Sequence, residues 1–244
     1  MVCQLSHPEL VRLTDRYRRL AVLCGLVGAF RFSGVRGRTA STAHGGDGQG
    51  SETLSFEHAV ISTGSRPIQI PGFEFAEDHV WSSADALDAD TVPDRLGVVG
   101  GGYIGMELAT TYAKLGADVT VVEMFDDVLP MYDDEISAVV RQQATDLGVD
   151  FRFGEAASEW EQVDDGIVVT TETENGDTSE YAADAALVVA GRQPAPDTVN
   201  LAAVDINPTD DGFIPTDAQG RTPHDHIFAV GDVAGDPMLA HRAY

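Results

Sequence analysis

The sequence predicts an α/β fold: a parallel sheet packed with helices, to which an antiparallel β-meander is attached. Between residues 96 and 153, apolar strand-like runs alternate with amphipathic helical patterns, which predicts a β-α-β-α-β unit with right-handed crossovers. Three short alternating segments near 158–163, 166–172 and 178–183 are separated by Asp-Gly and Asn-Gly turns, the pattern of a meander. Several apolar runs also end in glycine, as strands do where their carboxyl ends meet a ligand.

Composition limits the class of protein and of partner. The chain has 244 residues, enough for one large or two small domains. It carries 40 acidic residues against 15 basic ones, a net charge of −25. Such an anionic surface repels nucleic acids and anionic lipids, so we expect neither nucleic acid nor membrane as a partner. Because the same charge repels itself, it predicts a halophilic protein whose compact state needs the counterions of a salt-rich cytoplasm.

The first fifty residues differ from the rest. They hold seven arginines and three acidic residues, a net charge of +4. Leucines at helical spacing predict a helix over about 9–23, and eight glycines predict irregular chain over 25–50. The arginines and the apolar run after them also resemble a secretion signal, but this run is too short to span a membrane. The enzyme-like sequence that follows favours a cytoplasmic protein.

The cysteines indicate no redox or metal chemistry. Cys3 and Cys24 lie far apart, outside any CxxC or zinc-binding spacing. We therefore expect two reduced thiols and no metal site.

From residue 51 onward the pattern is more regular. A buried strand is expected over 59–62, followed by an acid-rich linker through Thr91. Five more strands are expected at 96–99, 118–122, 149–153, 185–189 and 226–230. Two helices are expected, over 104–115 with Gly116 as its cap, and from Asp133 or Asp134 to Gly148. The second helix should bury five apolar side chains, those of Ile136, Val139, Val140, Ala144 and Leu147.

A glycine fingerprint joins the strand at 96–99 to the helix that follows: Gly100-Gly101-Gly102-Tyr103-Ile104-Gly105. In the GxGxxG pattern, the first glycine permits a tight turn and the second lets a pyrophosphate approach the backbone. The third lets the helix pack closely on the sheet. The amides and the dipole of the helix N-terminus then hold the phosphates. This arrangement predicts a Rossmann-type dinucleotide site.

An acidic residue stands at the distance that such a site requires. Glu123 ends the strand at 118–122, where a carboxylate accepts hydrogen bonds from the adenosine ribose hydroxyls. It would also repel a 2′-phosphate, and no arginine follows it in Met124-Phe125-Asp126. This favours NAD over NADP. A flavin stays open as the ligand, because FAD uses the same fingerprint, and so does a glycine turn that binds nothing.

Three further strand ends share one form, a short apolar run that stops at glycine beside a polar residue. They are Ile61-Ser62-Thr63-Gly64, Val189-Ala190-Gly191-Arg192 and Ala229-Val230-Gly231-Asp232. Ligands bind at the carboxyl ends of parallel strands, and the Asp232 carboxylate is placed to accept hydrogen bonds from a sugar-alcohol chain. Each of these is individually a common strand end, but their order is specific.

Taken together, these segments resemble the pyridine nucleotide–disulfide oxidoreductases, most closely the dihydrolipoamide dehydrogenases. The stretches that match are 59–67, 100–107, 191–194, 222–235 and 238–243. The resemblance covers about 45–244. It implies a Rossmann-type NAD domain at 80–196, inserted into an incomplete FAD-binding Rossmann-like domain whose parts lie at 45–79 and 197–244. Residues 1–44 remain an atypical N-terminal segment.

The resemblance also implies roles for individual residues. Asp232 would hold the ribityl chain of FAD, and Glu107 would face the junction of nicotinamide and flavin, unless it is an ordinary exposed glutamate. The other implied cofactor contacts are Thr63 and Gly64 through backbone at the flavin nucleotide, Ala240 through its amide at the flavin, Gly191 near the nicotinamide and Ala157 near the adenine.

The sequence departs from the family in ways that limit its function. Residues 1–44 contain neither the family's first GxGxxG, for FAD, nor its redox cysteine pair. No segment matches the interface domain that carries its acid/base histidine and glutamate, and His241 is an ordinary histidine. The resemblance thus implies a flavin-mediated hydride transfer between a dithiol and NAD, with no catalytic residue in this chain, which alone we expect to be inactive.

Two alternatives follow from the same residues. One is an NAD-binding module without catalysis. The other, a flavin-independent NAD dehydrogenase, is disfavoured because it needs neither the meander nor Gly231-Asp232. Members of the family dimerise, and the resemblance implies a dimer that joins a 2-oxoacid dehydrogenase complex.

Overall fold

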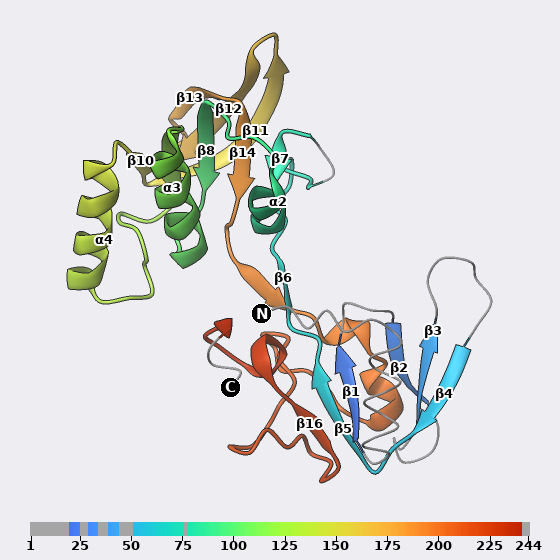
Figure 1. The fold of residues 1–244 in the computed structure, drawn as a ribbon. Helices are drawn as coiled ribbons and strands as arrows, with labels where there is room; N and C mark the ends of the chain where they lie inside the picture. The colour runs from blue at the N-terminus through green and yellow to red at the C-terminus, as the bar shows by residue number, and fades with distance from the viewer. Residues whose placement is uncertain (1–19, 25–28, 34–38, 44–50, 76–77, 241–244) are drawn as a thin grey trace. The chain divides into compact units, whose positions relative to one another are not determined.

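The computed structural model describes residues 20–24, 29–33, 39–43, 51–75 and 78–240, and Figure 1 shows the fold. The described chain divides into two compact units. One unit ends at Arg66 and resumes at Gln193, and the other runs from Pro67 to Arg192. The chain crosses between them at β6 (Ser65–Pro67) and β15 (Arg192–Pro194), which pair with each other. The family resemblance implied an inserted domain at 80–196.

The unit from Pro67 to Arg192 is built on a five-stranded sheet with the order β10-β9-β8-β14-β7, in which every pairing is parallel. Its strands are β7 (Val80–Trp81), β8 (Arg95–Val99), β9 (Asp118–Glu123), β10 (Asp150–Phe153) and β14 (Ala185–Val188). Its helices are α2 (Ser83–Asp88), α3 (Tyr103–Leu115) and α4 (Asp134–Asp146). The predicted α/β unit is therefore confirmed, and Gly116 caps α3 in the left-handed conformation, with φ 102°.

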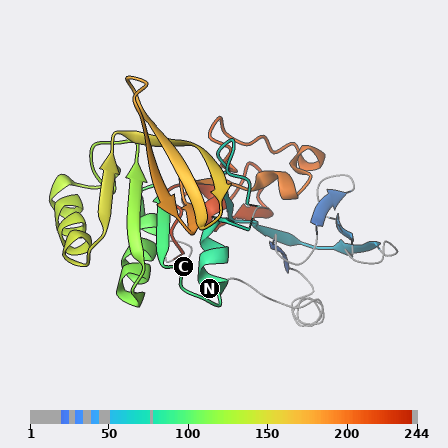
Figure 2. The ribbon, with the colours of Figure 1, turned by 90° about the horizontal axis from the view of Figure 1, so that it is seen from above.

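The meander packs on the sheet face opposite to the helices, as Figure 2 shows. It comprises β11 (Glu155–Val163), β12 (Gly166–Thr173) and β13 (Thr178–Ala183), paired antiparallel. Successive side chains of each parallel strand point to opposite faces of the sheet. Val98 contributes to the core beneath α3, and the next residue, Val99, packs beneath the meander. The unit thus has three layers, and all three predicted meander segments are confirmed.

The other unit contains a smaller parallel sheet with the order β1-β5-β16. Its strands are β1 (Leu20–Cys24), β5 (His58–Ser62) and β16 (Ile227–Ala229). A second, antiparallel sheet is formed by β2 (Ala29–Ser33), β3 (Thr39–Ala43) and β4 (Ser51–Ser55). The described part of this unit also contains three 3₁₀ turns, namely η1 (Pro196–Thr198), η2 (Leu201–Val204) and η3 (Gly231–Ala234).

Two predictions for the first fifty residues were wrong where the structure describes them. The helix predicted over 9–23 ends in residues that form β1, because their apolar run pairs with β5 rather than continuing a helical face. Residues 9–19 lie outside the described part. The segment predicted as irregular, 25–50, contains β2 and β3.

Two predictions for the other unit were also wrong. The acid-rich linker before Thr91 contains β7 and α2, and a reciprocal capping box between Ser82 and Asp85 begins that helix. In α4 the predicted inner face is largely outside: the exposed fractions of Ile136, Val139 and Leu147 are 48%, 57% and 40%. Only Ala144 of the predicted five is buried, and Val140 is partly so. The helix instead buries Ser137, whose small side chain lets α4 lie close to the residues before it.

Within the described residues, no helix is long and apolar enough to cross a lipid bilayer.

Candidate functional site

The fingerprint loop leads from the buried strand β8 into α3, and two of its glycines are required by the fold itself. Gly100 has φ 114°, and a Cβ there would stand 2.6 Å from the carbonyl oxygen of Val189, beyond the end of β14. A Cβ on Gly105 would stand 1.9 Å from the carbonyl oxygen of Gly100. The bare backbone of Gly100 thus lets the loop lie against the end of β14, and that of Gly105 lets α3 pack against the loop.

Gly102 is different, because it faces open space. It is the N-cap of α3 with φ −69°, an ordinary conformation for any residue, and no side chain caps this helix end. A Cβ on Gly102 would meet no atom of the described residues within 4 Å. In an α-helix the amides of the first turn have no acceptor within the helix itself. The open space at Gly102, the backbone amides and the positive end of the helix dipole together suit a pyrophosphate.

Glu123 lies against this loop, at the end of β9. The exposed fraction of Glu123 is only 6%. Its Oε2 accepts a hydrogen bond of 2.6 Å from the amide of Gly101, and its Oε1 accepts one of 3.0 Å from the amide of Phe125. The neighbouring strands explain the contact, because β8 and β9 pair with Val99 opposite Val122. A buried carboxylate with two amide donors keeps lone pairs for further donors such as ribose hydroxyls.

The first turn of α3 anchors the helix to the core. Tyr103 and Ile104 are partly buried and pack against the apolar cluster beneath α3. Glu107, one turn further, is exposed, and its backbone oxygen accepts a hydrogen bond from the Thr111 hydroxyl.

Ala157 and Gly191 lie on other elements of the same unit. Ala157 is partly buried in β11, at a register shift between β11 and β12, and packs against the cluster beneath the meander. Gly191 is exposed, with φ 133°, and its carbonyl accepts a hydrogen bond from Ile68. It follows Val189 and Ala190, the residues that border Gly100. The structure thus brings the fingerprint and Glu123 into contact. Gly191 is the next residue in the chain after the two that border the fingerprint loop.

The remaining predicted residues belong to the other unit. At the end of β5, Thr63 holds a buried hydroxyl without a hydrogen-bond partner among the described residues, and Gly64 has φ 68°. Asp232, in η3, accepts a 2.5 Å hydrogen bond from the Ser65 hydroxyl. An orphaned hydroxyl and a carboxylate at neighbouring parallel strand ends fit part of a flavin site. Ala240 is exposed, and the four residues after it lie outside the described part.

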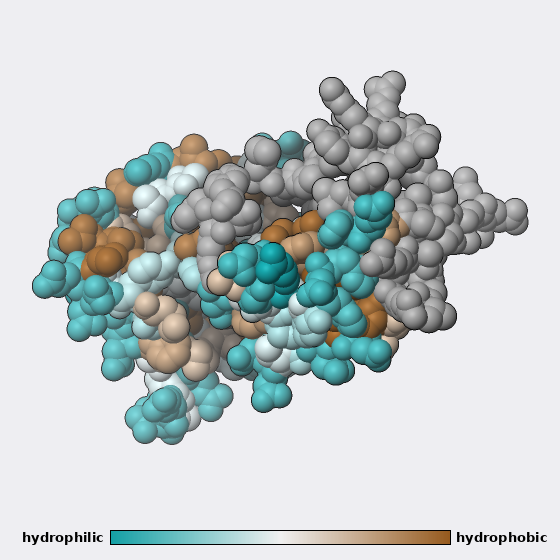
Figure 3. Space-filling model, turned by 90° about the horizontal axis from the view of Figure 1, so that it is seen from below, coloured by the Kyte–Doolittle hydropathy of each residue, from teal (hydrophilic) through white to brown (hydrophobic). Residues whose placement is uncertain are grey.

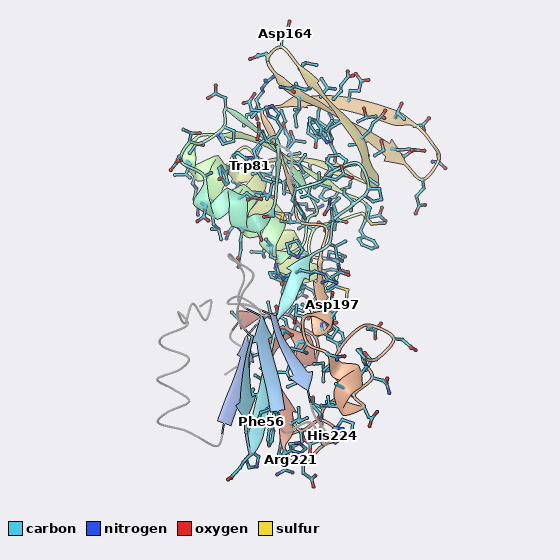
Figure 4. The ribbon with its side chains drawn as sticks, turned by 90° about the vertical axis from the view of Figure 1, so that its right-hand side faces the viewer. Phe56, Trp81, Asp164, Asp197, Arg221 and His224 are labelled. Atoms are coloured by element: carbon cyan, nitrogen blue, oxygen red, sulfur yellow. The ribbon has the colours of Figure 1, made fainter. Side chains whose placement is uncertain are left out.

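Sequence reasoning gave no role to several residues that organise these sites. Ser65 and Arg66 belong to the matching segment 59–67, but only the structure shows their partners, Asp232 and Asp197. Hydrogen bonds from Arg66 outweigh partial burial and lower the pKa of Asp197, which Figure 4 labels. Leu129, with φ 53°, donates its amide to the carbonyl of Gly101. No local sequence pattern signals these long-range contacts.

An open cavity of about 660 Å³ lies at the opposite, amino-terminal ends of β5 and β16. It is lined by Glu57, His58, Pro223, His224, Asp225 and His226. Figure 4 shows His224 at the same end of this unit as Phe56 and Arg221. Despite the histidines, no group of three or more His, Cys, Asp or Glu side chains in the described chain is placed to hold a metal ion.

The family model described as pyridine nucleotide-disulphide oxidoreductase matches residues 31–244. The match begins fourteen residues before the resemblance drawn from motifs, so the stretch from 31 to 44, predicted as atypical, falls within it.

Curated relatives and solved structures extend the comparison. The chain is 61% identical to a dihydrolipoyl dehydrogenase of Haloferax volcanii, over 82% of this chain and 42% of the relative. It is 58% identical to dihydrolipoyl dehydrogenase 2 of Haloarcula marismortui, over 84% of this chain and 43% of that protein. The chain therefore spans about two fifths of these relatives' length.

Among solved structures, one similar to this chain is a copper(II) complex of a cysteine-to-serine variant of the HOCl-induced flavoprotein disulfide reductase RclA of Escherichia coli. Its TM-score is 0.78 at 27% identity, covering 88% of this chain and 47% of that one.

Proposed function

The chain belongs to the pyridine nucleotide-disulphide oxidoreductase family, and from that premise we propose that it is the NAD-binding and partial FAD-binding portion of a dihydrolipoyl-dehydrogenase-like oxidoreductase. One observation carries the proposal. Gly102 borders open space at the N-terminus of α3, and the buried carboxylate of Glu123 contacts the same loop. A pyrophosphate and the adjoining adenosine ribose need these two features side by side.

In this proposal the residues of the larger site divide by ligand part. The fingerprint Gly100–Gly105, with Tyr103 and Ile104 opening α3, holds the pyrophosphate, and Glu123 accepts from the ribose. Ala157 lies near the adenine and Gly191 near the nicotinamide. The carboxylate of Glu123 disfavours a 2′-phosphate, and the next three residues include no arginine, so the cofactor is NAD rather than NADP.

The flavin contacts come from the other unit. Thr63 and Gly64 approach the flavin nucleotide, Asp232 accepts from the ribityl chain, and Ala240 offers its amide. A bound flavin supplies the chemistry of hydride transfer between a dithiol and NAD. The sequence holds only Cys3 and Cys24, far apart, so we assign the thiol step to no residue of this chain.

The visible spectrum of the purified protein tests the proposal. A yellow protein whose flavin absorbance is bleached by NADH supports flavin-mediated hydride transfer. A titration with NADH and NADPH should show preference for NADH, and the double variant Glu123→Ala with Met124→Arg should lose it. A protein that binds neither nucleotide refutes the proposal.

A second candidate is an NAD-binding module without catalysis. It is favoured by the absence from residues 1–44 of a second GxGxxG and of a close cysteine pair. A colourless protein that binds NADH, and that gains no flavin on incubation with FAD, supports this candidate over the first.

We further propose a cytoplasmic, salt-adapted protein that dimerises and joins a 2-oxoacid dehydrogenase complex, with small-molecule cofactors as its other ligands. Light scattering in molar salt tests the dimer, and co-purification with the other enzymes of such a complex tests the assembly.

A further inference from the structure

We propose that Glu123 is a positioning residue for the fingerprint loop, one that fixes the loop's conformation before a dinucleotide arrives, in addition to reading the ribose. The inference concerns what holds Gly101 in place. It rests on the proposed function only for its ligand, because the contacts that carry it lie within the chain itself.

The first observation is that Gly101 is tied on both sides to the segment that follows β9. Its amide donates to Glu123 Oε2 at 2.6 Å, and its carbonyl accepts from the amide of Leu129 at 2.9 Å. Gly101 is buried, and it has no side chain that could anchor the loop in another way. Its conformation therefore depends on partners in the segment 123–129.

The second observation is the environment of the carboxylate. Glu123 is 6% exposed, and none of the ion pairs found among the described residues includes it. A buried carboxylate without a cation needs hydrogen bonds from elsewhere. The amides of Gly101 and Phe125 donate these bonds, and such charge-assisted bonds are stronger than neutral ones. The loop and the carboxylate thus stabilise each other.

The third observation is geometric. An added Cβ on Gly101 would stand 3.1 Å from Glu123 Oε2, whereas on Gly102 it would meet nothing within 4 Å. The carboxylate thus lies against one glycine and leaves the next one open. Each carboxylate oxygen has a second lone pair, so ribose hydroxyls can bind while the Gly101 and Phe125 bonds persist. The Glu123 carboxylate then both fixes the conformation of the loop and binds the ribose. Removal of its charge should therefore loosen the loop and weaken ribose binding.

Amide hydrogen exchange of the cofactor-free, full-length chain tests the loop directly. Glu123→Gln removes the charge at nearly constant size, and Glu135→Gln makes the same change at an exposed position in the first turn of α4. We expect Glu123→Gln to speed exchange at Gly101 and its neighbours by about tenfold or more, since a charge-assisted bond is lost. Glu135→Gln should leave loop exchange unchanged. Unchanged exchange in Glu123→Gln would overturn the proposal.

A second measurement separates the two roles of Glu123. The wild type and Glu123→Gln are titrated with NADH and with an NADH analogue whose adenosine ribose lacks both hydroxyls. A positioning role predicts that Glu123→Gln weakens binding of both ligands, the analogue by about tenfold and NADH by more, because NADH also loses its ribose contact. Weakened binding of NADH alone, with the analogue unaffected, overturns the positioning role and leaves NAD binding intact. Wild-type protein that binds neither ligand refutes the proposed function, and the exchange measurement then still decides the loop.

Circular dichroism verifies that the variants fold. Should Glu123→Gln fail to fold, Glu123→Asp replaces it, because it keeps the charge but withdraws the carboxylate by one methylene. We expect loop exchange in Glu123→Asp to be faster than in the wild type. Wild-type exchange rates in Glu123→Asp would equally overturn the proposal.

Discussion

The glycines of the fingerprint serve different purposes. Gly105 is needed for packing, since a Cβ there would clash with the carbonyl of Gly100 at 1.9 Å. Gly102 has no steric reason within the protein to lack a side chain. The proposed function gives this glycine a reason, because a side chain here would block a pyrophosphate. Substitutions of Gly105 and Gly102 therefore separate an effect on folding from an effect on binding.

We expect Gly102→Ala to fold with a free energy of unfolding within about 1 kcal/mol of the wild type, the cost of alanine at an N-cap. Its affinity for NADH should fall by about tenfold or more, because a methyl group would occupy the approach of the pyrophosphate. Gly105→Ala should lower the free energy of unfolding by about 1–3 kcal/mol through overpacking. Urea unfolding and NADH titration measure both effects, and wild-type NADH affinity in Gly102→Ala would contradict the site.

A second residue-scale prediction concerns Asp184, which ties the end of the meander to β8. Its carboxylate accepts from the backbone amide of Arg95 at 2.8 Å and from the guanidinium at 2.6 and 3.2 Å. Partial burial raises the pKa of Asp184, but the hydrogen bonds and charge of Arg95 outweigh it, so the pKa lies below its usual value. The charged pair therefore stabilises the fold above the ordinary aspartate pKa, and this contribution is lost as the pH falls through the lowered pKa.

We expect Asp184→Asn to unfold at a lower urea concentration than the wild type at neutral pH, with the difference disappearing in strong acid. Asp164→Asn makes the same change at the exposed tip of the β11–β12 hairpin, which Figure 4 labels, and should have little effect at either pH. If Asp184→Asn still unfolded at a lower urea concentration than the wild type in strong acid, the charged pair would not be the source of the lost stability.

At the scale of elements, local patterns predicted the strands and helices whose apolar faces repeat within one segment. These local patterns failed where the structure of a segment depends on strand pairing with residues distant in the sequence. Residues 20–24 continue a leucine spacing that suits a helix, yet they become β1 because β5 offers a parallel partner. Likewise, the fingerprint and Glu123 were readable from spacing alone, whereas the Glu123–Gly101 bond depends on the register between β8 and β9. Local sequence does not encode that register.

Helix α4 shows the same limit in its orientation. Periodicity identified its apolar residues but could not tell which face would meet the sheet. Its buried face carries Ser137 and Ala144, and larger apolar side chains lie outside. Figure 3 shows apolar surface among hydrophilic surface at the left-hand end of the view, where α4 lies.

Two adjacent valines of α4 make this orientation testable. Val139 is 57% exposed, whereas Val140 packs partly buried against the core beneath α3. Valine and serine have similar helix propensities, so the substitutions differ mainly in burial. We expect Val139→Ser to change the free energy of unfolding by no more than about 0.5 kcal/mol, and Val140→Ser to lower it by about 1–2 kcal/mol. Equal costs, measured by urea unfolding, would mean that α4 is rotated from the orientation described here.

At the scale of the whole molecule, charge dominates. The net charge is −25, and only one of the 15 basic residues is a lysine. The ion pairs among the described residues mostly join partly exposed groups, and such pairs contribute little stability. Most of the acidic residues therefore repel one another across the surface. The high identity to dihydrolipoyl dehydrogenases of Haloferax volcanii and Haloarcula marismortui agrees with adaptation to salt.

Salt should therefore control stability. The Debye length shrinks from about 10 Å at 0.1 M salt to about 3 Å at 1 M, so molar KCl screens the repulsion between neighbouring carboxylates. We expect the thermal midpoint to rise steeply from low salt to about 1 M KCl. Sucrose, an uncharged solute that stabilises by exclusion from the surface, is the control and should give a smaller rise at equal osmolarity. Equal stability in dilute buffer and in molar KCl would contradict charge repulsion as the dominant destabilising force. A matching rise in sucrose would attribute the effect to exclusion instead.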